Sequence, residues 1–255
     1  MTSKGPYPDI LFHFTDRSGL RGVVADGFRL SYARERIEAR NRKREFAVPI
    51  VSFCDLRLSE LPFHMRKYGR FGIGMRKSWA MTAGLNPVAY ANKDGEFMNA
   101  LFGGLEAYYE QVMGPYSTLP ASATSDYMNL LNTLRYIKNY EGPLVRGTKK
   151  ARQYRFADER EWRYVLQLNA PSDLWPFVPI EKIGTVEQKQ QFNQMLLGRE
   201  LNFQASDVAY VIVPNEANIA PIRKHIKSLA GRYGAAGVEH MSARILTAAQ
   251  IEADM

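Results

Sequence analysis

Short segments rich in β-branched and aromatic residues recur along the chain and alternate with longer segments of helical spacing. The strand-type segments stand at residues 9–15, 48–54, 71–76, 161–168 and 208–214. Their length suits strands, and segments of ten or more residues with helical spacing lie between them. The sequence contains no internal repeat and no low-complexity tract. This mixture predicts a fold of the α+β class.

The first strand and the first helix are the most clearly marked pair. Residues 9–15, DILFHFT, predict a strand that ends near Thr15. Asp16 or Ser18 can cap the helix that follows in SGLRGVVADGF, and Gly27 stands where that helix would end. His13 is therefore expected near the end of a strand, just before a turn.

Two longer regions carry weaker signals. Residues 31–45 combine helical spacing with little apolar content, which predicts an exposed helix or a mobile loop. Residues 96–138 predict two helices separated by the Pro- and Ser-rich segment GPYSTLPASAT. We therefore expect one domain over residues 1–255, with a helical insert at about 96–140.

Several classes of site and location are disfavoured. The chain lacks the common hydrolase, phosphate-loop and zinc-protease motifs, and its four histidines are scattered without ligand spacing, so no metal is expected. A single cysteine, Cys54, excludes an intrachain disulfide and a cysteine-rich zinc site. No run approaches the roughly 18 apolar residues of a membrane span, and the N-terminus lacks a secretory pattern. We expect a cytoplasmic protein that does not bind a membrane.

The formal net charge of +8 favours a polyanionic partner. Basic residues concentrate in RERIEARNRKR, residues 34–44, and in KKARQYR, residues 149–155. Two interpretations stay open, namely solvated faces or a surface for the phosphates of a nucleic acid or dinucleotide. The second interpretation assigns nucleic-acid contacts to Arg40, Arg42, Lys43, Arg44, Lys149, Lys150 and Arg152.

His13 and Ser52 are candidates for ligand binding. An imidazole at a strand end can donate or accept a hydrogen bond, although His13 could equally be a structural residue between Phe12 and Phe14. Alternation along a strand places Ser52 on the opposite face from Phe53. Ser52 could contact a ligand or be a buried hydroxyl bonded to backbone.

The segment EREWR, residues 159–163, offers two candidate carboxylates. Glu161 is preferred, because alternation in a strand places it on the same face as Arg163. Glu159 remains the alternative. An ordinary ion pair between Glu161 and Arg163 would give the same pattern without catalysis.

Three segments, in this order, resemble the ADP-ribosyltransferase superfamily: LFHFTDRSGLRGVVADGFRL, VSFCD and FADEREWRYVLQL. The resemblance implies an α+β fold with a split antiparallel sheet and NAD as the substrate. It implies that His13 and Ser52 seat the nicotinamide half, and that Glu161 holds the ribose and stabilises positive charge as nicotinamide leaves. The residues expected to bind NAD are His13, Phe14, Thr15, Ser52, Phe53, Tyr68 and, at the pyrophosphate, Arg34.

At the level of one family, the chain resembles AbiGi, a phage abortive-infection component. The resemblance rests on LFHFT, on VSFCDLRLS followed by His64 and YGRFGIGM, and on KSWA, NPVAY, EWRYV and DVAYVIVP. It implies a role in phage defence. With the positive charge, it leads us to expect a toxin that transfers ADP-ribose from NAD to single-stranded RNA or DNA, with protein modification and NAD hydrolysis as alternatives.

The family label also includes an antitoxin role, which implies a catalytically inactive module that binds a toxin or senses a phage component. A nucleic-acid-binding protein without NAD chemistry is the third interpretation. If the chain is a toxin, an antitoxin protein is a possible partner, and the helical insert at residues 96–138 is the expected contact because it is rich in Tyr, Met and Leu.

Overall fold

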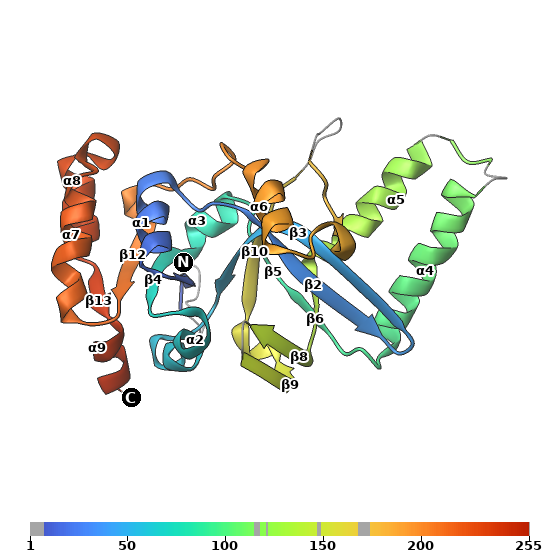
Figure 1. Ribbon diagram of the computed structural model, residues 1–255, viewed down its shortest axis with the longest axis horizontal. Coiled ribbons are helices and arrows are strands. Elements are labelled where there is room, and N and C mark those ends of the chain that lie inside the picture. The colour runs from blue at the N-terminus through green and yellow to red at the C-terminus, as the bar shows by residue number, and fades with distance from the viewer. Residues whose placement is uncertain (1–7, 115–117, 121, 147–148, 168–173, 255) are drawn as a thin grey trace, which may run out of the picture.

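A computed structural model describes residues 8–114, 118–120, 122–146, 149–167 and 174–254. It has a mixed α+β architecture in which helices cover both faces of a central sheet (Figure 1). The α+β class predicted from the sequence is therefore confirmed. None of the helices in these ranges is both long and apolar enough to cross a membrane.

The central sheet is built around one long strand, β3. Its strands run in the order β13 (Ile245–Thr247), β12 (Val208–Val213), β4 (Phe71–Arg76), β1 (Ile10–Thr15), β3 (Arg42–Cys54), β10 (Glu161–Val165) and β5 (Asn86–Pro87). Two further strands, β2 (Ser31–Ala39) and β11 (Val178–Pro179), also pair with β3. Neighbours in this sheet are antiparallel except β12 and β13, which are parallel, so the sheet is mixed and not purely antiparallel as expected.

The predicted first strand and helix are confirmed. Helix α1 (Arg17–Asp26) follows β1, and the Asp16 carboxylate caps it by accepting from the backbone N–H of Gly19 at 2.7 Å. Gly27 ends the helix at a φ of 98°, where a Cβ atom would lie 2.9 Å from the carbonyl oxygen of Leu201. Glycine at this position lets the chain turn sharply toward β2.

The expected helix or loop at residues 31–45 is wrong, because this segment forms strand β2 and the first part of β3. The two strands pair from Ser31↔Ile50 to Ala39↔Arg42. Ile37 and Ala39, two residues apart, share a buried face, which is the period of a strand. The charged residues around them obscured that period, because the hairpin brings charged side chains such as Arg36 and Glu45 together.

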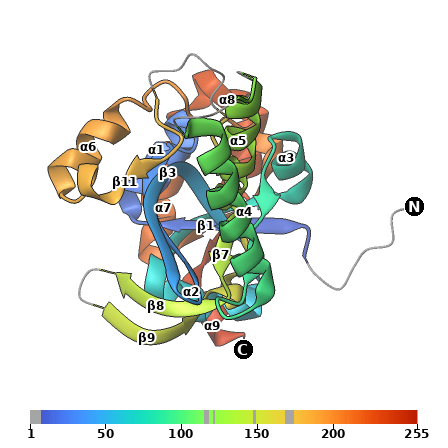
Figure 2. The ribbon, with the colours of Figure 1, turned by 90° about the vertical axis from the view of Figure 1, so that its right-hand side faces the viewer.

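The two helices predicted within residues 96–138 are present, with one correction. Helices α4 (Glu96–Met113) and α5 (Ser122–Asn132) pack on the β2–β3 hairpin and bury a second apolar core, with Phe102 and Leu105 against Ile37 and Phe46. Figure 2 shows both helices in front of β3. A short 3₁₀ turn follows α5, and residues 137–139, expected at the helix end, form strand β7 (Ile137–Asn139) beside β6 (Ala89–Ala91).

The other elements complete the two faces of the sheet. Helices α1, α3 (Lys77–Thr82), α7 (Ile219–Lys227) and α8 (Ala230–Ser242) cover one face. Helices α2 (Leu61–Tyr68) and α9 (Ala248–Ala253) cover the other. Helix α6 (Val186–Gln194) packs on β2, and β8 (Glu141–Arg146) forms a separate hairpin with β9 (Lys149–Arg155).

Candidate functional site

The central sheet splits between β1 and β3. These strands share one register pair, Phe12↔Cys54, whereas β1 pairs with β4 over its whole length. On the same edge of β3, pairing with β2 begins only at Ile50. Ile50 also pairs with Val165 of β10, so β10 lies along the opposite edge of β3 from β2. Strand β10 likewise lies opposite β1, so β1 and β2 share one edge of β3. Residues 51–53 of β3 therefore face a gap between two strands.

His13 contacts the backbone exposed by this gap. Its Nδ1 lies 2.8 Å from the carbonyl oxygen of Ser52. A carbonyl oxygen only accepts, so Nδ1 carries the proton and Nε2 is left as an acceptor in the neutral ring. Burial lowers the pKa of His13, against the opposing effect of the Ser52 carbonyl, and this favours the neutral imidazole.

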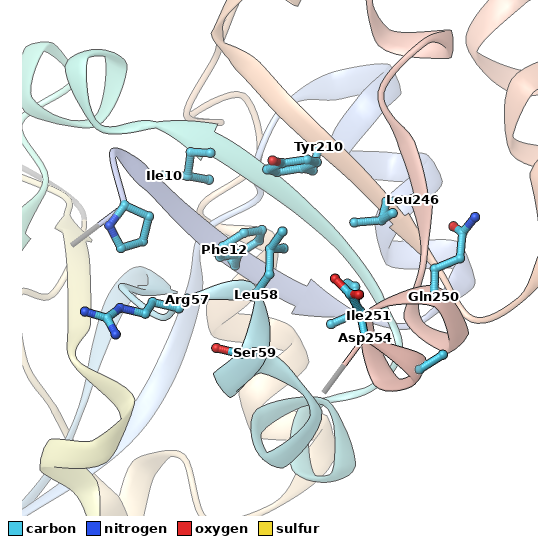
Figure 3. Close-up of a pocket in the computed structure, with 12 residues that line it drawn as sticks. Ile10, Phe12, Arg57, Leu58, Ser59, Tyr210, Leu246, Gln250, Ile251 and Asp254 are labelled. Atoms are coloured by element: carbon cyan, nitrogen blue, oxygen red, sulfur yellow. The ribbon is translucent and has the colours of Figure 1, made fainter. Parts of the chain in front are cut away.

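Two cavities border β1 on its two sides. One, of about 820 Å³, is mainly apolar and lies between β1, β12 and α9, lined by residues such as Phe12, Leu58, Tyr210 and Ile251 (Figure 3). The other, of about 910 Å³, opens at the gap and is lined by polar and charged side chains from seven parts of the chain. These include His13, Arg34, Glu35, Ser52, Tyr68, Lys138, Glu159 and Glu161.

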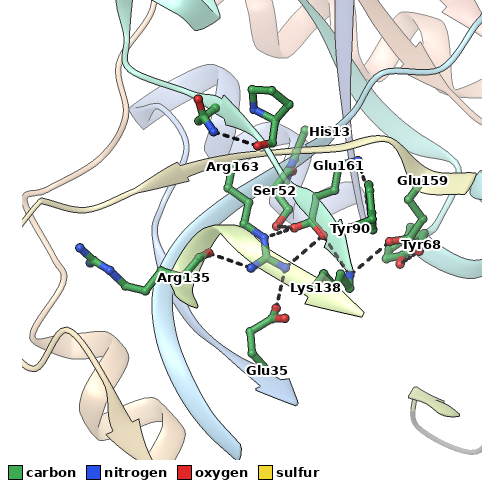
Figure 4. Close-up of polar contacts among 12 residues, drawn as sticks. His13, Glu35, Ser52, Tyr68, Tyr90, Arg135, Lys138, Glu159, Glu161 and Arg163 are labelled. Atoms are coloured by element: carbon green, nitrogen blue, oxygen red, sulfur yellow. Dashed lines mark hydrogen bonds and ion pairs between the residues drawn. The ribbon is translucent and has the colours of Figure 1, made fainter. Parts of the chain in front are cut away.

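Glu161 is the centre of a buried polar network in the second cavity (Figure 4). Its Oε1 accepts from Ser52 Oγ at 2.6 Å and from Arg163 Nε at 2.6 Å. Its Oε2 accepts from Lys138 Nζ at 2.9 Å and from a second Arg163 nitrogen at 3.2 Å. A carboxylate has about four acceptor positions, and here each has a donor.

The network holds Glu161 in its ionised form. Burial opposes ionisation, but the Arg163 and Lys138 cations and the Ser52 hydroxyl together hold the pKa of Glu161 well below its usual range. In return, and again against burial, Glu161 and Glu35 raise the pKa of Arg163 and of Lys138. Three carboxylates, those of Glu35, Glu159 and Glu161, face these two cations, and Lys67 adds a further positive charge near Glu159.

Glu159 lies beside Glu161 and shares Lys138 with it. Its Oε1 accepts from the hydroxyls of Tyr68 and Tyr154, and Lys138 Nζ lies 3.4 Å from its Oε2. Burial and the neighbouring Glu159 charge raise the pKa of Tyr154 above its usual value, so its hydroxyl remains a donor. Both carboxylates named from the sequence therefore occupy one cluster.

The strand register places His13 and Glu161 on opposite faces of the sheet. Residues opposite one another across antiparallel strands share a face, and Cys54 pairs with both Phe12 and Glu161. Alternation then puts His13 on the other face, where its ring packs against Phe28 at a centroid distance of 5.4 Å. The two candidate residues border one cavity from its two sides.

Of the other residues predicted to bind NAD, some line the cavity and one does not. Phe14 and Tyr68 line the cavity, and the Tyr68 ring stacks on His64 at 4.2 Å. Thr15 is not among the lining residues and lies against Gly19 of α1. Phe53 lines the cavity, but its ring is buried among Phe28 and Trp79 in the main core.

Arg34 also borders the cavity, with one guanidinium nitrogen 2.5 Å from each of the carbonyl oxygens of Ile183 and Gly184. Cys54, the lone cysteine, is buried, and burial raises the pKa of its thiol. It is therefore a neutral apolar residue of the core.

The basic residues of the β2–β3 turn are paired with carboxylates. Arg40 contacts Glu96, and Arg42 and Arg44 contact Glu106 of α4, at 3.1–3.5 Å. Lys43 contacts Glu45 at 2.9 Å. These contacts attach the hairpin to α4, which the sequence interpretation as a phosphate surface did not anticipate. The side chains of Lys149, Lys150 and Arg152 lie outside the described part of the structure.

Two residues of the network had no signal in the sequence. Lys138 stands in a segment of helical spacing but belongs to β7, which the parallel pairing with β6 brings to the cavity. Tyr90 of β6 accepts from the backbone N–H of Glu161 at 2.7 Å. Burial raises the pKa of Tyr90 to about 12. Parallel pairing of two short distant segments leaves no local pattern from which either residue could be found.

Comparison with known proteins places the chain in a family. A family model described as putative abortive phage resistance protein AbiGi, antitoxin, matches residues 28–214, which include Ser52, Lys138 and Glu161. The abortive phage resistance protein AbiGi of Lactococcus lactis subsp. cremoris is 26% identical over 185 residues, covering 67% of this chain and 73% of that protein. No solved structure matches the chain. Because the family model spans well over half of its residues, the chain belongs to the AbiGi family of putative abortive phage resistance proteins.

Proposed function

We propose that this member of the AbiGi family is an NAD-dependent ADP-ribosyltransferase of phage defence, with its site at the gap between β1 and β3. The observation that carries the proposal is the contact between Ser52 and Glu161 beside that gap, with His13 on the other side. A split sheet bearing a His, a Ser and a Glu in this chain order is the arrangement that the resemblance to ADP-ribosyltransferases implies.

The electrostatics of the cluster suit this chemistry. When the glycosidic bond of NAD breaks, nicotinamide leaves with the bonding electrons and positive charge develops on the ribose. The ionised carboxylate of Glu161, held in a buried and fixed geometry, stabilises such a cation. A nucleophile then adds to the ribose carbon and loses its proton. A cavity of about 910 Å³ falls in the range typical of small-molecule sites.

The proposal assigns a movement to Lys138. Each acceptor position of Glu161 already has a donor, so a ribose hydroxyl can bind only if one donor gives way. Lys138 also contacts Glu159, and it can shift toward that carboxylate without losing an ionic partner. Ser52 and Arg163 would then keep Glu161 in place. Arg34, at the cavity edge, is the proposed contact for the pyrophosphate.

The direct test measures NAD consumption. Purified protein is given NAD labelled in the adenine half, and free nicotinamide and labelled RNA, DNA and protein are measured separately. We expect nicotinamide release that falls at least about tenfold in Glu161→Gln and His13→Ala. Glu106→Gln, which removes an exposed carboxylate remote from the cavity, is the matched control and should retain full activity. Absence of nicotinamide release and of label transfer from the folded parent protein would refute the enzyme proposal.

The separate label measurements also identify the acceptor. A nucleic-acid acceptor remains a prediction from the positive charge of the chain. Label on RNA or DNA would support it, label on protein alone would replace it, and nicotinamide release without any label would indicate hydrolysis.

An antitoxin is the second candidate function. The family description names an antitoxin, and the complete pairing of Glu161 fits a buried network that stabilises the fold without catalysis. Expression of the chain alone separates the candidates. A toxin should slow cell growth in a manner that Glu161→Gln relieves, whereas an antitoxin should leave growth unchanged and should protect cells from its cognate toxin.

A further inference from the structure

Glu35 of β2 lines the cavity of about 910 Å³ on the same face of the sheet as Glu161. It pairs with Phe46 and Glu161 pairs with Cys54, an even number of positions apart on β3, so the two side chains share a face. One Arg163 nitrogen, Nη2, donates to Glu35 Oε1 at 3.0 Å and to Glu161 Oε2 at 3.2 Å. Figure 4 shows the guanidinium between the two carboxylates, which therefore border the same part of the cavity.

The second oxygen of Glu35, Oε2, has no hydrogen-bond or ion-pair partner among the described residues. The Glu35 side chain is only 10% exposed, yet Oε2 is not sealed from solvent. Because Glu35 lines the cavity, this oxygen is accessible from it. A nearly buried carboxylate therefore presents one unpartnered oxygen to the space beside Glu161.

The other two carboxylates of the cluster are occupied. Each acceptor position of Glu161 has a donor, and Glu159 accepts from two tyrosine hydroxyls and from Lys138. A carboxylate with filled positions takes up a proton only after a donor leaves, whereas Glu35 Oε2 can take one directly. Protonation of Glu35 also leaves Arg163 in contact with Glu161, so the buried cation stays paired.

We infer that Glu35 is the base that receives the proton of the nucleophile, an inference that rests on the ADP-ribosyltransferase activity proposed above. In that reaction the bond between the anomeric carbon of the ribose and nicotinamide breaks, and its electrons neutralise the ring nitrogen of nicotinamide. An O–H or N–H group of the acceptor forms the new bond to the anomeric carbon and transfers its proton to Glu35 Oε2. Glu161 stays ionised beside the ribose cation. In enzymes that hydrolyse sugars through such a cation, two carboxylates likewise act together, one of them as base for the attacking group.

The test measures nicotinamide release by the parent protein, by Glu35→Gln and by a matched control. The control is Glu45→Gln, which removes an equal charge from the strand that pairs with β2. Glu45 contacts Lys43 and Arg36 and does not line the cavity. Each variant is first compared with the parent by its thermal midpoint. Rates are then measured over a range of NAD concentrations, with and without added azide, a nucleophile that has no proton to lose.

We expect kcat to fall at least about a hundredfold in Glu35→Gln with KM for NAD unchanged, since general base catalysis contributes roughly this factor or more. Azide should restore the rate and form ADP-ribosyl azide. Glu161→Gln should not be rescued, because it lacks the charge that stabilises the ribose cation. Glu45→Gln should match the parent. If Glu35→Gln does not fold, Glu35→Asp keeps the charge beside Arg163 but draws the carboxylate back from the cavity, and it should show a loss of rate that azide again restores.

A folded Glu35→Gln protein with the full rate, or with a low rate that azide does not restore, overturns the inference and leaves Glu35 as a structural partner of Arg163. Either result leaves the NAD chemistry of the parent intact. A folded parent protein that releases no nicotinamide overturns the proposed function and this inference together.

Discussion

Replacement of Glu161 by glutamine tests the polar network through stability, independently of any activity. The glutamine keeps the shape of the side chain but removes the negative charge that faces Arg163, whose side chain is fully buried, and Lys138. Removal of one partner from a buried ion pair costs roughly 3–5 kcal/mol, because it leaves an uncompensated charge. Glu35 still contacts Arg163 and Glu159 still contacts Lys138, so we expect a loss near the lower end, about 3 kcal/mol.

The same substitution should change the pH dependence of stability. The pKa of Glu161 is lower in the folded protein than the usual value near 4.5, so the folded state binds its proton less readily than the unfolded chain. Its contribution is therefore complete above the unfolded pKa and is lost as the pH falls below it. One group of this kind gives a slope of up to about 1.4 kcal/mol per pH unit in the acid range. Glu161→Gln should remove this part of the slope.

Urea unfolding followed by circular dichroism, at neutral pH and at several acidic values, measures both effects. Glu106→Gln is the matched control, since Glu106 is 45% exposed, and its pairs with Arg42 and Arg44 should contribute no more than about 1 kcal/mol. A loss below about 1 kcal/mol in Glu161→Gln, together with an unchanged acid slope, would refute the interpretation of Glu161 as the charged centre of the network.

Three further predictions concern the scaffold of the site. Gly27→Ala places a Cβ at a φ of 98° and 2.9 Å from a carbonyl oxygen, so it should lower the free energy of unfolding by more than about 1 kcal/mol, seen as a lower thermal midpoint. Gly22→Ala, with open space around it, is the control and should not destabilise the protein. Phe28→Ala removes a ring that contacts His13, Phe53, Trp79 and Phe203 and should cost roughly 3–5 kcal/mol in urea unfolding; a cost below about 1 kcal/mol would mean that this aromatic cluster does not support the gap. Burial raises the pKa of Tyr90 to about 12, so its stabilising contribution is present below its usual pKa near 10 and is lost as the pH rises toward 12. Tyr90→Phe should therefore flatten the curve of unfolding free energy against pH in that alkaline range. An unchanged curve would contradict a raised pKa for Tyr90.

Local signals in the sequence were sufficient for the elements that depend on neighbouring residues. The Asp16 cap, the end of α1 at Gly27, and the shared face of Glu161 and Arg163 all follow from contacts within a few positions. The network was harder to predict, because Lys138 and Tyr90 reach Glu161 only through the parallel pairing of β6 with β7. A single lysine or tyrosine in a short strand forms no sequence pattern from which a contact with Glu161 could be predicted.

The β2–β3 hairpin escaped prediction for a related reason. Residues 34–36 and 42–45 are all charged, and several of their partners lie across the hairpin or on α4, far along the chain. Solvated side chains and paired side chains look alike in a sequence. The same ambiguity applies to the expected nucleic-acid surface, because the density of basic residues along the chain says nothing about which of them lack a carboxylate partner.

Strand β3 runs without interruption from Arg42, which contacts α4, to Cys54, next to the gap. One end is attached to the helical pair and the other holds the Ser52 hydroxyl against Glu161. Strand β3 is paired along this whole length, so α4 and Ser52 are attached to one continuous element. A protein bound to α4 would therefore be linked to the strand that carries Ser52, without having to enter the cavity.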